Sequence, residues 1–242
     1  MTPRAFVAGA TGYTGRAVVA SLIAHGAEAI AHVRPDSSAL AHWRDRFGSL
    51  GADVDTTPWA ESAMLETITR LRPTHIFALL GTTRKRARRA AAAGAKTRED
   101  YEAIDYGLTA MLLRAAVDSG LTPHFTYLSA IGASVKSRNE YVRVRGRVQA
   151  ELMVSGLPYL IAQPSFITGD DRDEPRPLER YGAKAVDGFL KAVAVLGGGR
   201  IRDRYGSMTG TELGDSLVRL ALASPRGRVV ADGVALRAAR RG

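Results

Sequence analysis

The chain has 242 residues, of which 45% are hydrophobic and 24% charged, with a formal net charge of +10 and no cysteine. This composition is typical of a globular protein, and the length allows one large α/β domain or one domain with a small appendage. The absence of cysteine excludes disulfides, thiol catalysis and cysteine-metal sites. No run approaches the ~18 apolar residues of a membrane span. The first strand follows Met1 so closely that we expect no signal or transit peptide, and therefore a cytoplasmic protein without membrane contact.

A glycine-rich turn near the N-terminus dominates the sequence. It reads Gly9-Ala10-Thr11-Gly12-Tyr13-Thr14-Gly15, between the apolar run 5–8 and an amphipathic stretch at 16–25. In a strand–turn–helix context such glycines allow a tight turn, close approach of a pyrophosphate and packing of the helix on the strand. The start of the helix then binds the phosphates. We therefore expect Gly9, Thr11, Gly12, Tyr13, Thr14 and Gly15 to bind a dinucleotide; the alternative is a packing turn without a ligand.

Strands and helices alternate through the next 150 residues. Apolar runs predict further strands at 28–33, 52–55, 74–80, 124–128 and 158–163, and helical spacing predicts helices at 40–47, 61–71, 101–119 and 140–153. Strands that alternate with helices in this way form a parallel, doubly wound sheet, the Rossmann arrangement. The fold class is therefore α/β, with a dinucleotide-binding domain over residues 1–168.

The end of the second strand bears on which nicotinamide nucleotide is bound. An acidic residue about 20 positions after the glycines binds the ribose hydroxyl of NAD, whereas an Arg suits the 2′-phosphate of NADP. Arg34 stands there and Asp36 follows a Pro. The sequence therefore favours NADP(H) over NAD(H), unless Arg34 is simply a solvated residue at a strand end. Trp59, after the third strand, either covers an adenine edge or caps the core, and we favour the core.

Basic residues concentrate in one run, at 84–89, after the fourth strand. Such a run is usually a solvated face, although its place at a strand's carboxyl end would also suit an anionic substrate or the cofactor phosphates. No nucleic-acid-binding motif accompanies the charge, which argues against a nucleic-acid partner. The five histidines show no metal-ligand spacing, so we expect no metal site.

The alternating pattern breaks at Gly169, after which a polar loop spans 170–177. Helical spacing follows at 189–196 and 212–223, with a last strand at 228–231. Residues 169–242 are too few for an independent domain, so we expect a small substrate lid packed on the Rossmann domain. The basic end, 237–241, is expected to fray.

With Ser129 and Tyr141 included, the motifs of the chain resemble those of a known family, the atypical, extended-like short-chain dehydrogenase/reductases. Within them it is most similar to the NAD(P)H-binding NmrA-like group, and there to the Tat-interacting oxidoreductase-like proteins. The stretches that carry the resemblance cover most of residues 4–232: they are 9–15, 80–84, 127–129, 141–146 and 173–177.

The resemblance implies a catalytic group of Ser129, Tyr141 and residue 145. In active members a Tyr and a Lys four residues later perform acid–base chemistry beside a Ser that orients the substrate oxygen. Residues i and i+4 share a helix face, and a tyrosine, whose pKa is ordinarily about 10, needs a nearby cation to ionise near neutrality. Position 145 is Arg, a larger and forked cation that does not safely replace Lys.

Two functions remain open. One is an NADP(H)-dependent oxidoreductase that transfers hydride to or from a small carbonyl or alcohol substrate. The other is a non-catalytic NADP(H)-binding redox sensor that signals to a protein partner; a homodimer is also open. The resemblance places Leu80, Gly81, Thr82 and Thr83 along the cofactor, with Gln163, Pro164, Ser165 and Phe166 near the nicotinamide. Residues 58 and 59 depart from the acidic–apolar pair of many relatives, which weakens the expected adenine contacts.

Overall fold

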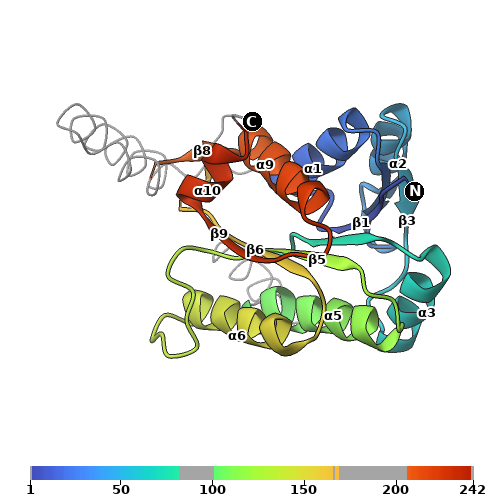
Figure 1. Cartoon of the computed structure of the whole chain (residues 1–242). Coiled ribbons are helices and arrows are strands. Elements are labelled where there is room, and N and C mark those ends of the chain that lie inside the picture. Colours follow the sequence, from blue (N-terminus) through green and yellow to red (C-terminus); the bar gives the residue numbers. More distant parts are fainter. Residues whose placement is uncertain (1, 82–100, 166, 169–205, 241–242) are drawn as a thin grey trace.

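Seven parallel strands form one sheet in the computed structural model, which describes residues 2–81, 101–165, 167–168 and 206–240. The strand order is β3-β2-β1-β4-β5-β6-β9, and the chain reverses direction across the sheet after β3 (Figure 1). The strands are β1 Arg4–Ala8, β2 Glu28–His32, β3 Asp53–Asp55, β4 His75–Ala78, β5 His124–Leu128, β6 Tyr159–Gln163 and β9 Arg228–Asp232. This is the Rossmann topology that the alternating pattern predicted, so the fold class is confirmed.

Helices cover both faces of the sheet. One layer contains α1 and α9 and the other α3, α5 and α6 (Figure 1). The helices are α1 Tyr13–Ala24, α2 Leu40–Ser49, α3 Glu61–Leu71, the π-helix η1 Tyr101–Leu108, α5 Thr109–Asp118, α6 Glu140–Val154, α9 Gly210–Ala223 and α10 Gly233–Ala238. Within the described residues, no helix is both long and apolar enough to cross a bilayer.

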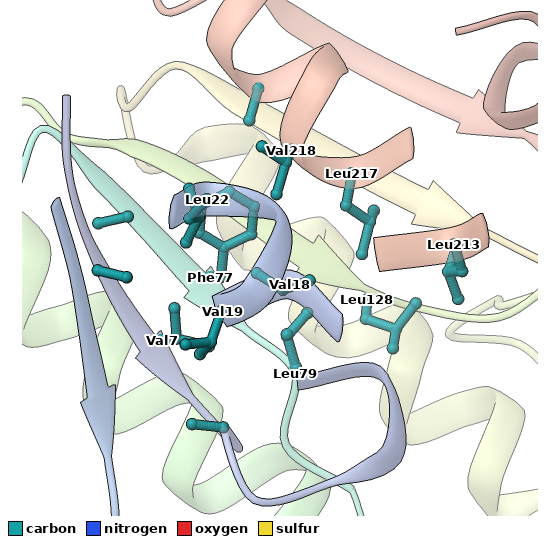
Figure 2. Packing of buried hydrophobic residues seen from close by; sticks show 14 of the residues in the cluster. Val7, Val18, Val19, Leu22, Phe77, Leu79, Leu128, Leu213, Leu217 and Val218 are labelled. Carbon is teal, nitrogen blue, oxygen red and sulfur yellow. The ribbon is translucent and has the colours of Figure 1, made fainter. Parts of the chain in front are cut away.

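Alternate residues of the strands build two separate cores. Val7 of β1 packs with α1 and α9, whereas its neighbour Phe6 packs with α3, α5 and α6. Successive strand side chains point to opposite faces, so a sheet buried on both sides must be apolar at nearly every position. In the first core, Leu213, Leu217 and Val218 of α9 lie opposite α1, as Figure 2 shows.

Two expected elements differ from the structure. The helix expected over 101–119 begins as the wider turns of η1 and becomes α-helical only at Thr109. The basic end expected to fray is ordered through residue 240: α10 is capped by the Asp232 carboxylate, and Arg237 donates to the carbonyl of Ser207 at 2.7 Å. Arg240 also pairs with Glu212. Helix caps and ion pairs to distant residues hold this segment, and charge alone did not reveal them.

The described part of the C-terminal segment joins the Rossmann unit directly. The strand β9 pairs with β6 as the seventh strand of the sheet, and α9 packs against α1. Two short strands, β7 Ile167–Thr168 and β8 Met208–Thr209, pair with each other in a small second sheet. The loop at 170–177 and the helix expected at 189–196 lie outside the described residues, so the substrate lid remains a prediction.

Candidate dinucleotide and substrate site

The glycine loop between β1 and α1 is held by contacts that only glycine permits. Gly9 has a φ of +84°, and a Cβ there would lie 2.7 Å from the carbonyl oxygen of Leu79. A Cβ on Gly15 would lie 2.1 Å from the carbonyl oxygen of Gly9. The Gly12 N–H donates to the same carbonyl at 3.0 Å and closes the turn. The first and last glycines thus fit the loop against the end of β4 and beneath α1.

The start of α1 provides a place for an anionic group. Its N-cap residue is Gly12, which has no side chain to cap the first N–H groups, and the first turn contains no acidic residue. A Cβ on Gly12 would meet the Gly9 carbonyl at 3.2 Å and no other group within 4 Å, apart from its chain neighbours. The loop is therefore open on the side where a pyrophosphate would approach, so the residues present fit a dinucleotide.

Most of the predicted site residues that the structure describes lie at the carboxyl ends of neighbouring strands. Leu80 and Gly81 follow β4, Ser129 follows β5 and Pro164 follows β6. The loops after β5 and β6 are tied together, because the Ile131 N–H donates to the Pro164 carbonyl at 3.1 Å. Ligands of open α/β sheets bind at this edge, at the point where the strand order reverses.

Arg145 is buried in the protein interior, which the sequence did not predict. Its guanidinium pairs with the buried Asp105 carboxylate of η1 at 2.6 Å, and it donates to the carbonyls of Leu128 and, at 3.3 Å, Leu80. One side chain of α6 therefore fastens the ends of β4 and β5. Gly81 leaves room for it, since a Cβ there would come 2.8 Å from the Arg145 Nη2 atom.

Tyr141 lies one helical turn before Arg145, and its ring packs against the Arg145 guanidinium. The Arg145 guanidinium carbon is 5.1 Å from the centroid of the Tyr141 ring, and Tyr101 of η1 packs edge-on against that ring at 5.3 Å. The spacing of four residues brings the two side chains together, as predicted. The cation lies against the aromatic face, however, and its Nη1 and Nη2 atoms already donate to Asp105 and two carbonyls, while its buried Nε has no hydrogen-bond partner among the described residues.

A second tyrosine, Tyr127 of β5, lies 5.7 Å from the Arg145 guanidinium. Burial raises the pKa of Tyr127 to about 12, although the neighbouring Arg145 opposes this rise. Tyr127 therefore stays neutral at physiological pH, and Asp105 is the anion that balances Arg145.

Ser129 is buried, with 3% of its surface exposed, and accepts a hydrogen bond from Gln149 Nε2 at 2.5 Å. Gln149 follows Arg145 by four residues, so α6 presents residues 141, 145 and 149 along one face. Neither Gln149 nor Asp105 was predicted as a site residue. The same spacing of four, continued one turn past Arg145, would have pointed to Gln149, whereas no sequence signal points to Asp105.

Arg34 lies just beyond β2, with its Nε 3.7 Å from the Asp36 carboxylate and a side chain that is 40% exposed. Trp59 packs against the core and against His32, as we favoured, with ring centroids 4.8 Å apart. Thr82, Thr83, Phe166, the basic run at 84–89 and the stretch 173–177 lie outside the described residues.

The fold and the glycine loop together define a Rossmann-type dinucleotide-binding protein. A family model described as NAD(P)H-binding matches residues 9–189, and the chain belongs to this family. UDP-glucose 4-epimerase from Brucella ovis in complex with NAD has the same fold, with a TM-score of 0.63 at 16% identity over 95% of this chain and 77% of that one. The family match and this likeness agree with the resemblance in two respects, NAD(P)H binding and the Rossmann fold.

Two curated relatives are fungal. Protein fmp52-1, mitochondrial, of Aspergillus terreus is 33% identical over 76% of this chain and 75% of its own. Protein fmp52, mitochondrial, of Emericella nidulans is 30% identical over 78% and 82%. These names contradict the expected cytoplasmic location, because both relatives are named mitochondrial. The expectation was drawn from missing features, namely a leader, a membrane span and cysteines, and such absences do not determine a compartment.

Proposed function

We propose that the chain is an NADP(H)-dependent oxidoreductase that acts on a small carbonyl or alcohol, in the NmrA-like group of its superfamily. The proposal rests on one observation: Arg145 joins the three parts of the site. It contacts the Tyr141 ring, it binds the carbonyl next to Ser129, and it binds the carbonyl next to Gly81. The proton donor, the substrate-orienting hydroxyl and the cofactor-lining strand end are thus held together at the edge where α/β proteins bind ligands.

Carbonyl reduction requires a hydride at carbon and a proton at oxygen. A bound reduced nicotinamide supplies the hydride. In this proposal the Ser129 hydroxyl donates a hydrogen bond to the carbonyl oxygen, and Tyr141 transfers its phenolic proton to that oxygen. The Arg145 charge against the ring stabilises the resulting phenolate until water returns the proton.

The preference for NADP(H) rests on Arg34, whose partly exposed side chain lies just beyond the end of β2. Titration with NADPH and with NADH, followed by nucleotide fluorescence, tests it. We expect NADPH to bind more tightly, and Arg34→Ala to remove that preference. Arg114→Ala is the matched control, because Arg114 is also an exposed, ion-paired arginine but lies on α5. Equal binding of both nucleotides by the unaltered protein would contradict the assignment.

Catalysis is tested by NADPH oxidation with phenanthrenequinone, a general carbonyl probe. We expect Tyr141→Phe to lower kcat by about 100-fold or more, since general acid catalysis contributes at least that much, while NADPH still binds. Activity that is equal in the two proteins would refute the role of Tyr141.

The second candidate is a non-catalytic NADP(H)-binding sensor with a protein partner. The Nη1 and Nη2 donors of Arg145 favour it, because they serve Asp105 and backbone carbonyls. Arg145→Lys separates the candidates: a reductase changes its rate while retaining NADPH, whereas a sensor acquires no activity.

A further inference from the structure

Ser129 is the first member of a hydrogen-bonded polar chain of three side chains, which continues through Gln149 to Gln163. Gln149 Nε2 donates to Ser129 Oγ at 2.5 Å, and Gln163 Nε2 donates to Gln149 Oε1 at 3.2 Å. Gln149 and Gln163 are the two glutamines of the chain. They come from different elements, α6 and the last position of β6, and meet beside Ser129.

The bond between the glutamines agrees with the end of the Gln149 amide that reaches Ser129. In the structure the Gln149 oxygen accepts from Gln163 Nε2, and the Gln149 NH₂ group faces the serine. The Ser129 oxygen is thereby used as an acceptor, and its own hydrogen is left to donate elsewhere. Gln149 is 6% exposed, so water cannot readily replace it in this role.

We propose that Gln149 is a positioning residue that holds Ser129 as a hydrogen-bond donor to the substrate oxygen, with Gln163 setting the orientation of Gln149. This rests on the proposed reductase function and adds a specificity consequence. A serine whose hydroxyl hydrogen is directed at the substrate favours a substrate group that accepts, such as a carbonyl oxygen.

The polar chain itself can be tested without any activity. Protein labelled at glutamine gives side-chain amide NMR signals from Gln149 and Gln163 alone. We expect the Gln149 amide protons to exchange slowly with solvent, and both Ser129→Ala and Gln163→Leu to shift its signal. Fast exchange, or a signal that neither substitution moves, overturns the proposal.

The kinetic role is tested by a double-mutant cycle with phenanthrenequinone and NADPH. We expect Gln149→Leu to lower kcat by about tenfold, the value of one well-placed hydrogen bond. Added to Ser129→Ala, it should cost nothing further, because it acts through the serine. Val148→Ala is the control: Val148 is a fully buried neighbour on α6, and its truncation should lower stability without changing kcat. Costs that multiply in the double mutant overturn the proposal.

Gln149→Glu gives a pH signature that a purely structural role would not produce. The carboxylate keeps the size of the side chain but accepts from Ser129, so the serine no longer donates to the substrate. Burial raises the pKa of such a carboxyl group, and its protonation restores a donor. We expect kcat to recover as pH falls in this variant alone; an unchanged pH profile contradicts the assignment.

The two proposals fail in different ways. If the unaltered protein oxidises NADPH no faster than Tyr141→Phe, the reductase function falls and the catalytic role of Gln149 falls with it, while the NMR result still decides whether the polar chain exists. If the unaltered protein is active but Gln149→Leu leaves kcat unchanged, the positioning role alone is refuted.

Discussion

Arg145 and Asp105 form an ion pair at 2.6 Å inside the protein, with side chains that are 6% and 0% exposed. The two residues come from α6 and η1. Removing one partner from such a pair leaves a buried charge without compensation, which costs more than the pair itself contributes.

We therefore expect Asp105→Asn to lower the free energy of unfolding by about 3 kcal/mol. Glu61→Gln is the comparison, because Glu61 pairs with Arg114 on the surface at the same distance of 2.6 Å. That exposed pair should contribute less than about 1 kcal/mol. Urea unfolding monitored by circular dichroism measures both, and equal losses would show that burial does not govern the cost.

Gly15→Ala should abolish nucleotide binding and destabilise the fold. The added Cβ would lie 2.1 Å from the Gly9 carbonyl oxygen, so α1 must move away from the loop. Gly48→Ala, in α2, is the control, because a Cβ there meets nothing within 4 Å. It should stabilise the protein by about 0.5–1 kcal/mol, as alanine does within a helix. NADPH titration and thermal unfolding distinguish the two, and normal binding by Gly15→Ala would refute the assigned packing.

A substitution on α9 should weaken NADPH binding, although no residue of that helix is predicted to contact the nucleotide. A Cβ on Gly214 would lie 2.7 Å from the Ala17 Cβ of α1. Gly214→Val should therefore cost about 1–3 kcal/mol by overpacking and reduce NADPH affinity, since α1 supports the glycine loop. Thr211→Ala, at an exposed position of the same helix, should change neither property. Full NADPH affinity in Gly214→Val would show that the helices move without the loop.

Two buried histidines make stability depend on pH. Burial lowers the pKa of His75, and burial together with the adjacent His75 lowers the pKa of His124 from 6.5 to about 4; the two rings lie 5.7 Å apart. The unfolded chain binds protons below pH 6.5, whereas the folded His124 resists protonation until about pH 4. The stabilising contribution of the neutral His124 is thus complete above pH 6.5. As pH falls to about 4, the free energy of unfolding decreases by up to about 3 kcal/mol because of this residue.

His124→Phe should flatten this part of the pH–stability curve, whatever its effect at neutral pH. His42→Phe, at an exposed position of α2, should leave the slope unchanged. Urea unfolding at a series of pH values provides the curves, and parallel slopes for all three proteins would refute the contribution of His124.

The sequence predicted the sheet well because each buried strand is a run of apolar residues and each helix repeats at its own period. The site was harder, because its polar contacts join distant residues. The spacing of Tyr141 and Arg145 indicated a shared helix face, but nothing in the sequence indicated that Asp105 would reach Arg145 across 40 positions. That contact begins in η1, whose wider turns the helical pattern at 101–119 did not reveal.

The packing of α9 on α1 has a consequence for biosynthesis. The rings and methyl groups that touch Gly210 and Gly214 belong to Tyr13 and Ala17, in the first turns after the glycine loop. During translation the glycine loop leaves the ribosome almost 200 residues before α9, the helix that packs on α1. The strand β9 completes the sheet later still. Such distant contacts form slowly. The nascent protein should therefore expose the side of α1 that packs on α9 for most of its synthesis, and a chaperone that shields this side would raise the yield of folded protein.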